Sequence, residues 1–237
     1  MTTNRKTRML DKASNKILES LSKESRAELR SMERVTLHSG MVLQEPDREI
    51  EHVYFVEGGL VSVLSVNDDG AAIEIGVIGS EGMVGIPAVL GGFCPYRAVV
   101  QIQGEAWRMR GKSIANHFQQ NRSLHDVLLK YTNSFLVQVA QGSICNCFHT
   151  LQERLSRWLL VAMDASGSGR LKVTHDVLAR LLGTRRASVT VTAGLLQKAG
   201  LITMSRGTIA ISNKSGLEEM ACECYQIVRE GVRRVLQ

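Results

Sequence analysis

The sequence predicts an α+β fold with three parts: an N-terminal antiparallel β-roll of the double-stranded jelly-roll type, a long central helix and a C-terminal winged helix-turn-helix. Three observations predict it. Hydrophobic side chains alternate with a period of two between residues 33 and 109, as in half-buried strands. The period changes to 3.6 over 123–146, where no Pro or turn cluster interrupts a helix. Two short helical patterns then flank Gly183, and an alternating hairpin follows them.

The expected β-roll occupies residues 1–120, including polar helices over 1–31. Its strands alternate regularly with segments rich in Gly, Pro, Asn and Asp, and Asp69-Gly70 is a strong hairpin signal. Many short strands at regular spacing are typical of an antiparallel barrel or sandwich. The expected strands are 33–37, 41–44, 52–56, 60–66, 71–78, 98–103 and 105–109.

The central helix is expected over 121–147, with an apolar stripe at 4-3-4-3 spacing. Such a stripe favours the seam of a two-helix coiled coil, and therefore a homodimer. The alternative is burial against the chain's own barrel, and different faces of the helix can serve both. The stripe consists of Leu124, Leu128, Tyr131, Phe135 and Gln138.

The C-terminal part, 148–237, begins with a helix over about 148–164 and a Ser/Gly linker. Thr174 should cap the first helix of the hairpin, and Gly183 should take the positive φ of the inter-helix turn. The second helix is expected to bury Val189, Leu195 and Leu196 and to expose polar residues near its start, including Thr192. The wing is expected as a hairpin over 202–211 with a three-residue loop containing Gly207. A single terminal helix should follow, capped by Ser215.

Positive charge is concentrated in this C-terminal part. The chain has a formal net charge of +6, and residues 150–214 hold 10 basic and 3 acidic side chains. A localised excess of this kind indicates a polyanionic partner, and cationic and hydroxyl side chains near the start of a second helix suit the major groove of double-stranded DNA. The alternative is an ordinary helical hairpin with a solvated basic face.

Several classes of protein are disfavoured by what the sequence lacks. No run of 18 apolar residues predicts a membrane span, and the basic N-terminus is not followed by the apolar segment of a secretory signal. We therefore expect a cytoplasmic protein with no membrane partner and with reduced cysteines. An enzyme is disfavoured because the chain has no P-loop, G-x-S-x-G or H-E-x-x-H motif.

The five cysteines are Cys94, Cys145, Cys147, Cys222 and Cys224. Residues i and i+2 of a regular helix point about 200° apart, so neither C-x-C pair should chelate one metal from a helix. We expect structural thiols and no metal site, with Cys94 the most reactive because it lies in a Gly/Pro-rich loop. The histidines His125, His149 and His175 look isolated, as surface or capping residues.

Two segments resemble the Crp/Fnr family of bacterial transcription regulators: Leu178-Ala-Arg-Leu-Leu-Gly-Thr-Arg-Arg-Ala-Ser-Val and Val53-Tyr-Phe-Val-Glu-Gly-Gly-Leu-Val-Ser-Val. The resemblance spans roughly residues 25–212. It implies a homodimer that is joined by its central helices, binds a palindromic operator and passes an effector signal to the recognition helices. RNA polymerase is a further partner that the resemblance implies.

The resemblance also assigns DNA contacts. Arg186 matches an arginine that can bridge guanine O6 and N7, and Arg185 adds a phosphate or second guanine contact. Ser188 and Thr190 should touch base edges or a phosphate. Thr174 and His175 should contact the DNA backbone and so position the protein on the duplex. Arg206 at the wing tip should contact a phosphate or a minor groove.

In the effector pocket the sequence departs from the members that bind cyclic AMP. The matching positions are Gly82, Met83, Arg97, Ala98, Val139 and Ala140, of which Arg97 alone keeps a side chain for an anion. Met83 cannot accept from a ribose hydroxyl and Ala98 cannot donate to a phosphate. We therefore expect no cyclic nucleotide and predict no cofactor. Two alternatives stay open: Glu81 replaces the lost carboxylate if the loop slips, or Arg97 binds a nucleotide or another small anion.

Overall fold

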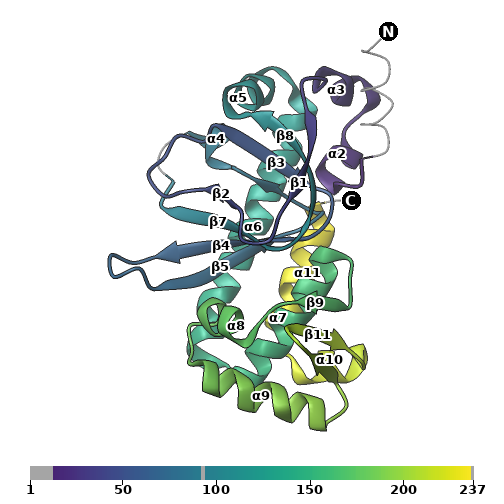
Figure 1. The fold of residues 1–237 in the computed structure, drawn as a ribbon. Coiled ribbons are helices and arrows are strands. Elements are labelled where there is room, and N and C mark those ends of the chain that lie inside the picture. Colours follow the sequence, from purple (N-terminus) through teal and green to yellow (C-terminus); the bar gives the residue numbers. More distant parts are fainter. Residues whose placement is uncertain (1–12, 92–93, 236–237) are drawn as a thin grey trace.

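The computed structural model describes residues 13–91 and 94–235 (Figure 1). The first described helices are α2 (Lys16–Ser20) and α3 (Lys23–Glu28), capped by the side chains of Asn15 and Ser22. The rest of the helical pattern expected at the N-terminus, residues 1–12, lies outside the described residues. Asn15 is fully buried, and its amide donates to the carbonyls of Val56 and Gly82, so it fixes α2 to the β-roll.

The β-roll consists of two antiparallel four-stranded sheets. One has the order β1-β8-β3-β6 and the other β2-β7-β4-β5. Gly70, with φ +81°, lies in the turn of the expected β4–β5 hairpin. The sequence missed only the two-residue strand β6, which is too short to show a period. The strands are β1 (Glu33–Leu37), β2 (Val42–Gln44), β3 (His52–Val56), β4 (Leu60–Val66), β5 (Ala72–Ile78), β6 (Met83–Val84), β7 (Tyr96–Ile102) and β8 (Gly104–Arg110).

The helices α4 (Pro87–Leu90) and α5 (Gly111–Gln120) complete this half of the molecule, and the long helix α6 (Arg122–Phe148) follows. The structure corrects the interface predicted on α6. Leu124, Leu128, Tyr131 and Gln138 are at most 8% exposed, because they pack on the chain's own β-roll. Phe135 is partly buried on the same side, packed against the core of the roll. The stripe is therefore an intramolecular seam, which was the alternative to a dimer interface. Because these side chains are covered by the chain's own β-roll, a second copy cannot contact them.

The winged helix follows as expected, and the fold class is confirmed. Gly183 has φ +58°, and the Thr174 side chain accepts from Val177 N as the cap of α8. The wing turn contains two residues, Arg206 and Gly207, instead of three. The elements are α7 (Leu151–Ser166), β9 (Arg170–Lys172), α8 (His175–Leu181), α9 (Arg186–Lys198), β10 (Ile202–Ser205) and β11 (Thr208–Ile211), with the sheet order β10-β11-β9.

Two details at the end of the chain were predicted wrongly. Leu195 is 49% exposed whereas Thr192 is buried, so the buried face of α9 is rotated from the expected one. The single terminal helix is instead two helices, α10 (Lys214–Met220) and α11 (Cys224–Val235), and Asn213 caps the first. Helix α11 runs back along α6 (Figure 1). Among the described residues, no helix is both long and apolar enough to cross a membrane.

The two halves share one hydrophobic cluster. Leu60 and Val77 of the β-roll pack with Trp158 and Leu159 of α7. The Trp158 indole donates to Glu74 Oε1 at 2.7 Å, and the Ser62 hydroxyl donates to the other carboxylate oxygen. Burial raises the pKa of Glu74 to about 7, so an ionisable group lies at the contact between the β-roll and α7.

Candidate DNA-binding surface and effector pocket

Helix α9 lies along the lower edge of the molecule in Figure 1. The candidate DNA-binding surface includes the N-terminal half of this helix. Arg185 is the N-cap residue and Arg186 the first residue of this helix, and both side chains are exposed. The Arg185 side chain does not cap the helix, so the first N–H groups of α9 keep no side-chain acceptor at that position. A helix start with free N–H groups and two guanidinium groups suits a phosphate or a base edge.

The first turns of α8 and α9 contact each other through polar side chains. His175 Nδ1 lies 3.0 Å from Thr190 Oγ1, which itself donates to the Arg186 carbonyl at 3.0 Å. Arg186 Nε lies 3.5 Å from Asp176 Oδ1, and both side chains are more than half exposed. The structure thus places Arg186, Thr190 and His175 together on one surface, whereas Ser188 is partly buried beside them.

Thr174 and Arg206 form a second part of this surface. Arg206 is exposed at the tip of the wing, and a Cβ built on its neighbour Gly207 would lie 3.7 Å from the Thr174 methyl group. The wing tip therefore sits against the start of α8. A phosphate group that met Arg206 would pass close to the N-terminal end of that helix.

Val191 was not among the predicted DNA contacts, although it is 66% exposed on α9. It follows Thr190 and lies about one helical turn after Ala187, which is also exposed. Its signal was present in the sequence as an apolar residue within the polar face of the recognition helix. An exposed methyl pair there is suited to contact the methyl group of thymine.

The predicted effector pocket inside the β-roll is closed. The remaining cavity has a volume of about 20 Å³, enough for about one water molecule. Met83, Tyr96, Ala98, Tyr131 and Phe135 line it. The Tyr131 hydroxyl donates to the Met83 carbonyl at 3.3 Å, and its ring packs directly on Gly82. Burial raises the pKa of Tyr131 above its usual range and that of Tyr96 to about 12, so both rings stay neutral.

The other predicted pocket residues do not converge on this cavity. Arg97 is 40% exposed and forms an ion pair with Glu45, with 2.7 Å between Nε and Oε2. Val139 is partly buried and Ala140 is exposed, and neither lines the cavity. Tyr131 and Phe135 enter the roll from α6 in their place, because they lie on the helix face that packs against the sheets.

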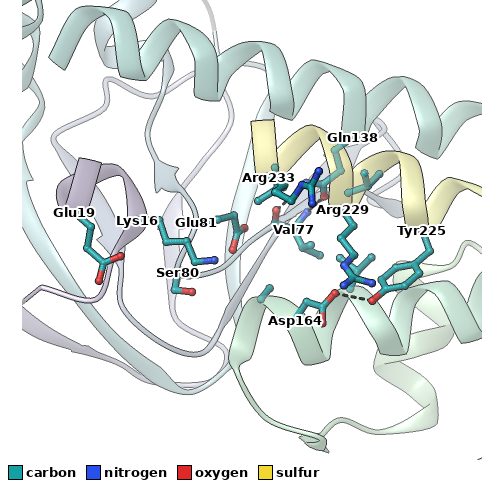
Figure 2. A pocket seen from close by; sticks show the side chains of 14 residues that line it. Lys16, Glu19, Val77, Ser80, Glu81, Gln138, Asp164, Tyr225, Arg229 and Arg233 are labelled. Atoms are coloured by element: carbon teal, nitrogen blue, oxygen red, sulfur yellow. Dashed lines mark hydrogen bonds between the residues drawn. The ribbon is translucent and has the colours of Figure 1, made fainter. Parts of the chain in front are cut away.

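A larger cavity of about 590 Å³ lies at the junction of α2, the β5–β6 connection, α7 and α11 (Figure 2). Its charged side chains include Lys16, Glu81, Asp164, Arg229 and Arg233. Glu81 accepts from Gly79 N at 2.8 Å, and burial raises its pKa. Glu81 lines this cavity and not the cavity of the β-roll, so it does not share a site with Arg97. Five separate segments form the cavity, since Gln138 of α6 also lines it, which explains why the sequence pattern gave no sign of it.

Comparisons with known proteins agree with this architecture. The family model described as a cyclic nucleotide-binding domain matches residues 34–121, and the model described as a Crp-like helix-turn-helix domain matches residues 153–220. The transcriptional regulator SdrP of Thermus thermophilus is 27% identical over 178 residues, which cover 72% of this chain and 84% of SdrP.

Solved structures share the fold at low identity. FixK2 from Bradyrhizobium japonicum is 16% identical with a TM-score of 0.69, over 81% of this chain and 98% of FixK2. A Crp/Fnr-family transcriptional regulator from Thermus thermophilus is 23% identical with a TM-score of 0.62, over 80% of this chain and 98% of that one. SdrP and the Thermus thermophilus structure are both described as transcriptional regulators. The chain belongs to the Crp/Fnr family of DNA-binding transcription regulators.

Proposed function

We propose that the chain acts as a homodimer that reads a palindromic operator through α9 and does not respond to cyclic AMP. The observation that carries the proposal is the exposed surface at the start of α9, where Arg185, Arg186 and Thr190 lie beside His175. A two-fold dimer would present two such surfaces to half-sites about 10 base pairs apart. At a promoter, the bound dimer would also meet RNA polymerase.

The dimer proposal rests on an apolar row on the outer face of α6. Leu136 is 61% exposed, Phe148 is 81% exposed, and Ala140 is exposed between them. The row is spaced by seven or four residues, which keeps it on one side of a helix. A second copy of α6 is the occupant that fits, because the same row on each copy forms an isologous two-fold contact. The row comprises Leu129, Leu136, Ala140, Ile144 and Phe148.

Leu136→Glu tests this contact. Two carboxylates facing each other in an apolar seam should convert the dimer to a monomer, measured by light scattering after size-exclusion chromatography. Leu90→Glu is the matched control, because Leu90 is 49% exposed on α4 and away from the row. A stable dimer in L136E would contradict the proposed seam.

For the DNA contacts, we propose that Arg186 bridges a guanine and that Val191 touches a thymine methyl group. The start of α9, Thr174 and Arg206 would contact phosphates. Selection of binding sites from random duplex DNA with the full chain should yield an inverted repeat with one guanine per half-site assigned to Arg186. Selected sites without symmetry would contradict binding as a two-fold dimer.

The lack of cyclic AMP response is proposed from the closed β-roll. A nucleotide would have to displace Tyr131 and Phe135 and break the Arg97–Glu45 ion pair before it could be held. Calorimetric titration of the purified protein with cyclic AMP and cyclic GMP should therefore give no saturable heat. Micromolar binding by either nucleotide would overturn this part of the proposal.

The cavity in Figure 2 favours a second candidate function, an effector site at the junction of the two halves. Its volume is in the range of small-molecule sites, and Lys16, Arg229 and Arg233 supply cations that suit an anionic group. This site is an alternative to the anion site expected at Arg97, which forms an ion pair with Glu45. If a small anion alters DNA binding, the double variant R229A/R233A should abolish the response, while R97A should leave it unchanged. The opposite result would return the site to Arg97.

A further inference from the structure

Four side chains that can ligate a metal meet where α6 ends and α11 begins. Cys145 comes from the last turns of α6, His149 is the C-cap residue of that helix, and Cys222 and Cys224 lie at the start of α11. Their ligand atoms all lie within 4.8 Å of one another. The Sγ atoms of Cys145 and Cys222 are 3.5 Å apart, and Cys224 Sγ lies 3.7 Å from His149 Nδ1.

The separations of 3.5 Å and 3.7 Å are close to the edges of a tetrahedral site. Zinc–sulfur bonds of about 2.3 Å place two thiolates of one tetrahedron about 3.8 Å apart, and a thiolate and an imidazole nitrogen slightly closer. Three cysteines and one histidine form one of the common structural zinc sets. In an iron–sulfur cluster the thiolates bind separate iron ions and lie farther apart than these do. A single bound ion therefore explains the observed separations better.

The backbone explains how a C-x-C pair can chelate here. The sequence-based expectation assumed that both cysteines lie within a regular helix. In the structure, Cys222 precedes α11 and Cys224 is the first residue of that helix. Both thiols are buried, with exposed fractions of 5% or less, and face Cys145. Cys147, two residues after Cys145 on α6, is exposed and takes no part, in agreement with the helical argument.

His149 was interpreted as isolated, and the structure corrects that interpretation. Its Nδ1 faces the thiols, while its Nε2 lies 3.3 Å from Glu223 Oε1. A carboxylate on the second ring nitrogen fixes the tautomer and orientation of a metal-bound histidine. Glu223 is the residue between the two cysteines, so the same short turn supplies two ligands and this orienting group.

Positive charge near the cluster suits a site with three thiolates. A zinc ion with three thiolates and a neutral imidazole carries a net charge of −1. Arg157 lies close enough to act electrostatically on Cys145, and Arg154 lies close enough to act on both Cys145 and Cys222. The Nε atoms of both arginines are buried without a hydrogen-bond partner among the described residues.

We propose that Cys145, His149, Cys222 and Cys224 bind one divalent zinc ion in a closed tetrahedral site. With four protein ligands the site has no open position for a substrate, so its role is structural. It would fix α11 to the end of α6, beside the first turn of α7. This inference does not depend on the effector or the operator proposed above.

Metal content and spectra test the proposal on the full chain, purified anaerobically without a metal-affinity tag. Wild-type protein should contain about one zinc per chain by mass spectrometry of metals. After chelation, cobalt(II) should restore thiolate-to-cobalt charge transfer and the intense visible bands of tetrahedral cobalt. Chelation should also lower the melting temperature of the wild type, and added zinc should restore it.

The neighbouring cysteine provides a matched control. C145S, C222S and C224S should each lose the zinc and the charge-transfer band, whereas C147S should keep both. If the serine variants fold poorly, chelation and reloading of the wild type still decide the question. The proposal is overturned by wild-type protein without zinc that gives no tetrahedral cobalt spectrum, by equal loss in C147S, by iron with acid-labile sulfide, or by a Cys145–Cys222 disulfide.

Discussion

The β-roll pocket and the surface of α9 are the two regions where this family meets small molecules and DNA, and they differ sharply here. The pocket is filled by its own aromatic side chains down to about 20 Å³. The start of α9 instead exposes arginine, threonine and valine side chains whose few protein partners are weak or solvent-accessible. The polar groups around the β-roll pocket have partners within the protein, whereas those at the start of α9 remain accessible to a partner molecule.

In the β-roll, side chains of α6 occupy the space where a ligand was expected, so they contribute to packing. Tyr131 lines the small cavity and its hydroxyl donates to the Met83 carbonyl, so this side chain joins α6 to the β-roll. The exposed arginines contribute little to stability, because surface ion pairs such as Arg186–Asp176 are worth less than about 1 kcal/mol. Substitutions in the first region should therefore change folding, and substitutions in the second should change binding.

The largest expected effect comes from Tyr131→Ala. Removing a buried ring that packs on Gly82 should lower the free energy of unfolding by about 3–5 kcal/mol, measured in urea. Tyr131→Phe keeps the ring and loses one hydrogen bond, so it should cost about 1 kcal/mol. A loss below about 1 kcal/mol in Y131A would show that the aromatic filling is not what holds the pocket closed.

Glu74→Gln tests the contact between the β-roll and α7. The pKa of Glu74 is about 7 in the folded protein, against 4.5 for the unfolded side chain, so the folded state binds its proton more tightly. Ionisation therefore destabilises the fold progressively from pH 4.5 to about 7, by up to about 3 kcal/mol. E74Q should exceed the wild type in stability at pH 8 and equal it near pH 4.

Thermal unfolding across pH measures this effect, and Glu219→Gln is the control because Glu219 is exposed on α10. E219Q should not alter the difference in stability between pH 4 and pH 8. Parallel pH profiles for E74Q and the wild type would show that folding does not raise the pKa of Glu74.

Arg186→Ala should change DNA binding without changing stability. Loss of a bidentate guanine contact should cost about 1–3 kcal/mol on the selected operator and relax the preference at one position per half-site. Fluorescence anisotropy with operator and random duplexes distinguishes a contact to a base from a contact to a phosphate. Equal weakening on both duplexes would reassign Arg186 to a phosphate contact.

The smallest effect is expected for Arg206→Ala at the wing tip. Loss of one phosphate contact should reduce the slope of log K against log salt by about 0.9 per site, with similar weakening on all sequences. The same anisotropy titrations at several salt concentrations give the slope. If R206A leaves the slope unchanged, the wing does not touch the DNA backbone.

Local patterns in the sequence predicted the elements well. Alternation located seven of the eight strands of the β-roll, and Gly183 and Thr174 marked the turn and cap of the helix-turn-helix. The resemblance then supplied candidate DNA contacts, several of which the structure gathers on one surface. These features depend on short stretches of chain, which is why periodicity and capping residues suffice to find them.

Features that depend on distant segments were not predictable in the same way. Helix α6 is apolar on two faces, so spacing alone could not tell the seam against the β-roll from the outer row of Leu136 and Phe148. The aromatic filling of the pocket required the side chains of α6 to be placed over the sheets. The thiol cluster joins residues 77 positions apart, and the turn that ends α10 makes it possible.

Gly183 lies in the turn between α8 and α9 and also against the β4–β5 hairpin. A Cβ at this position would lie 3.2 Å from Ile73 Cδ1, tighter than an ordinary van der Waals contact. Glycine is therefore favoured at position 183 by two independent features, the φ of +58° and the lack of room for a methyl group. The backbone of the helix-turn-helix can approach the β-roll this closely because the side chain between them is a single hydrogen atom.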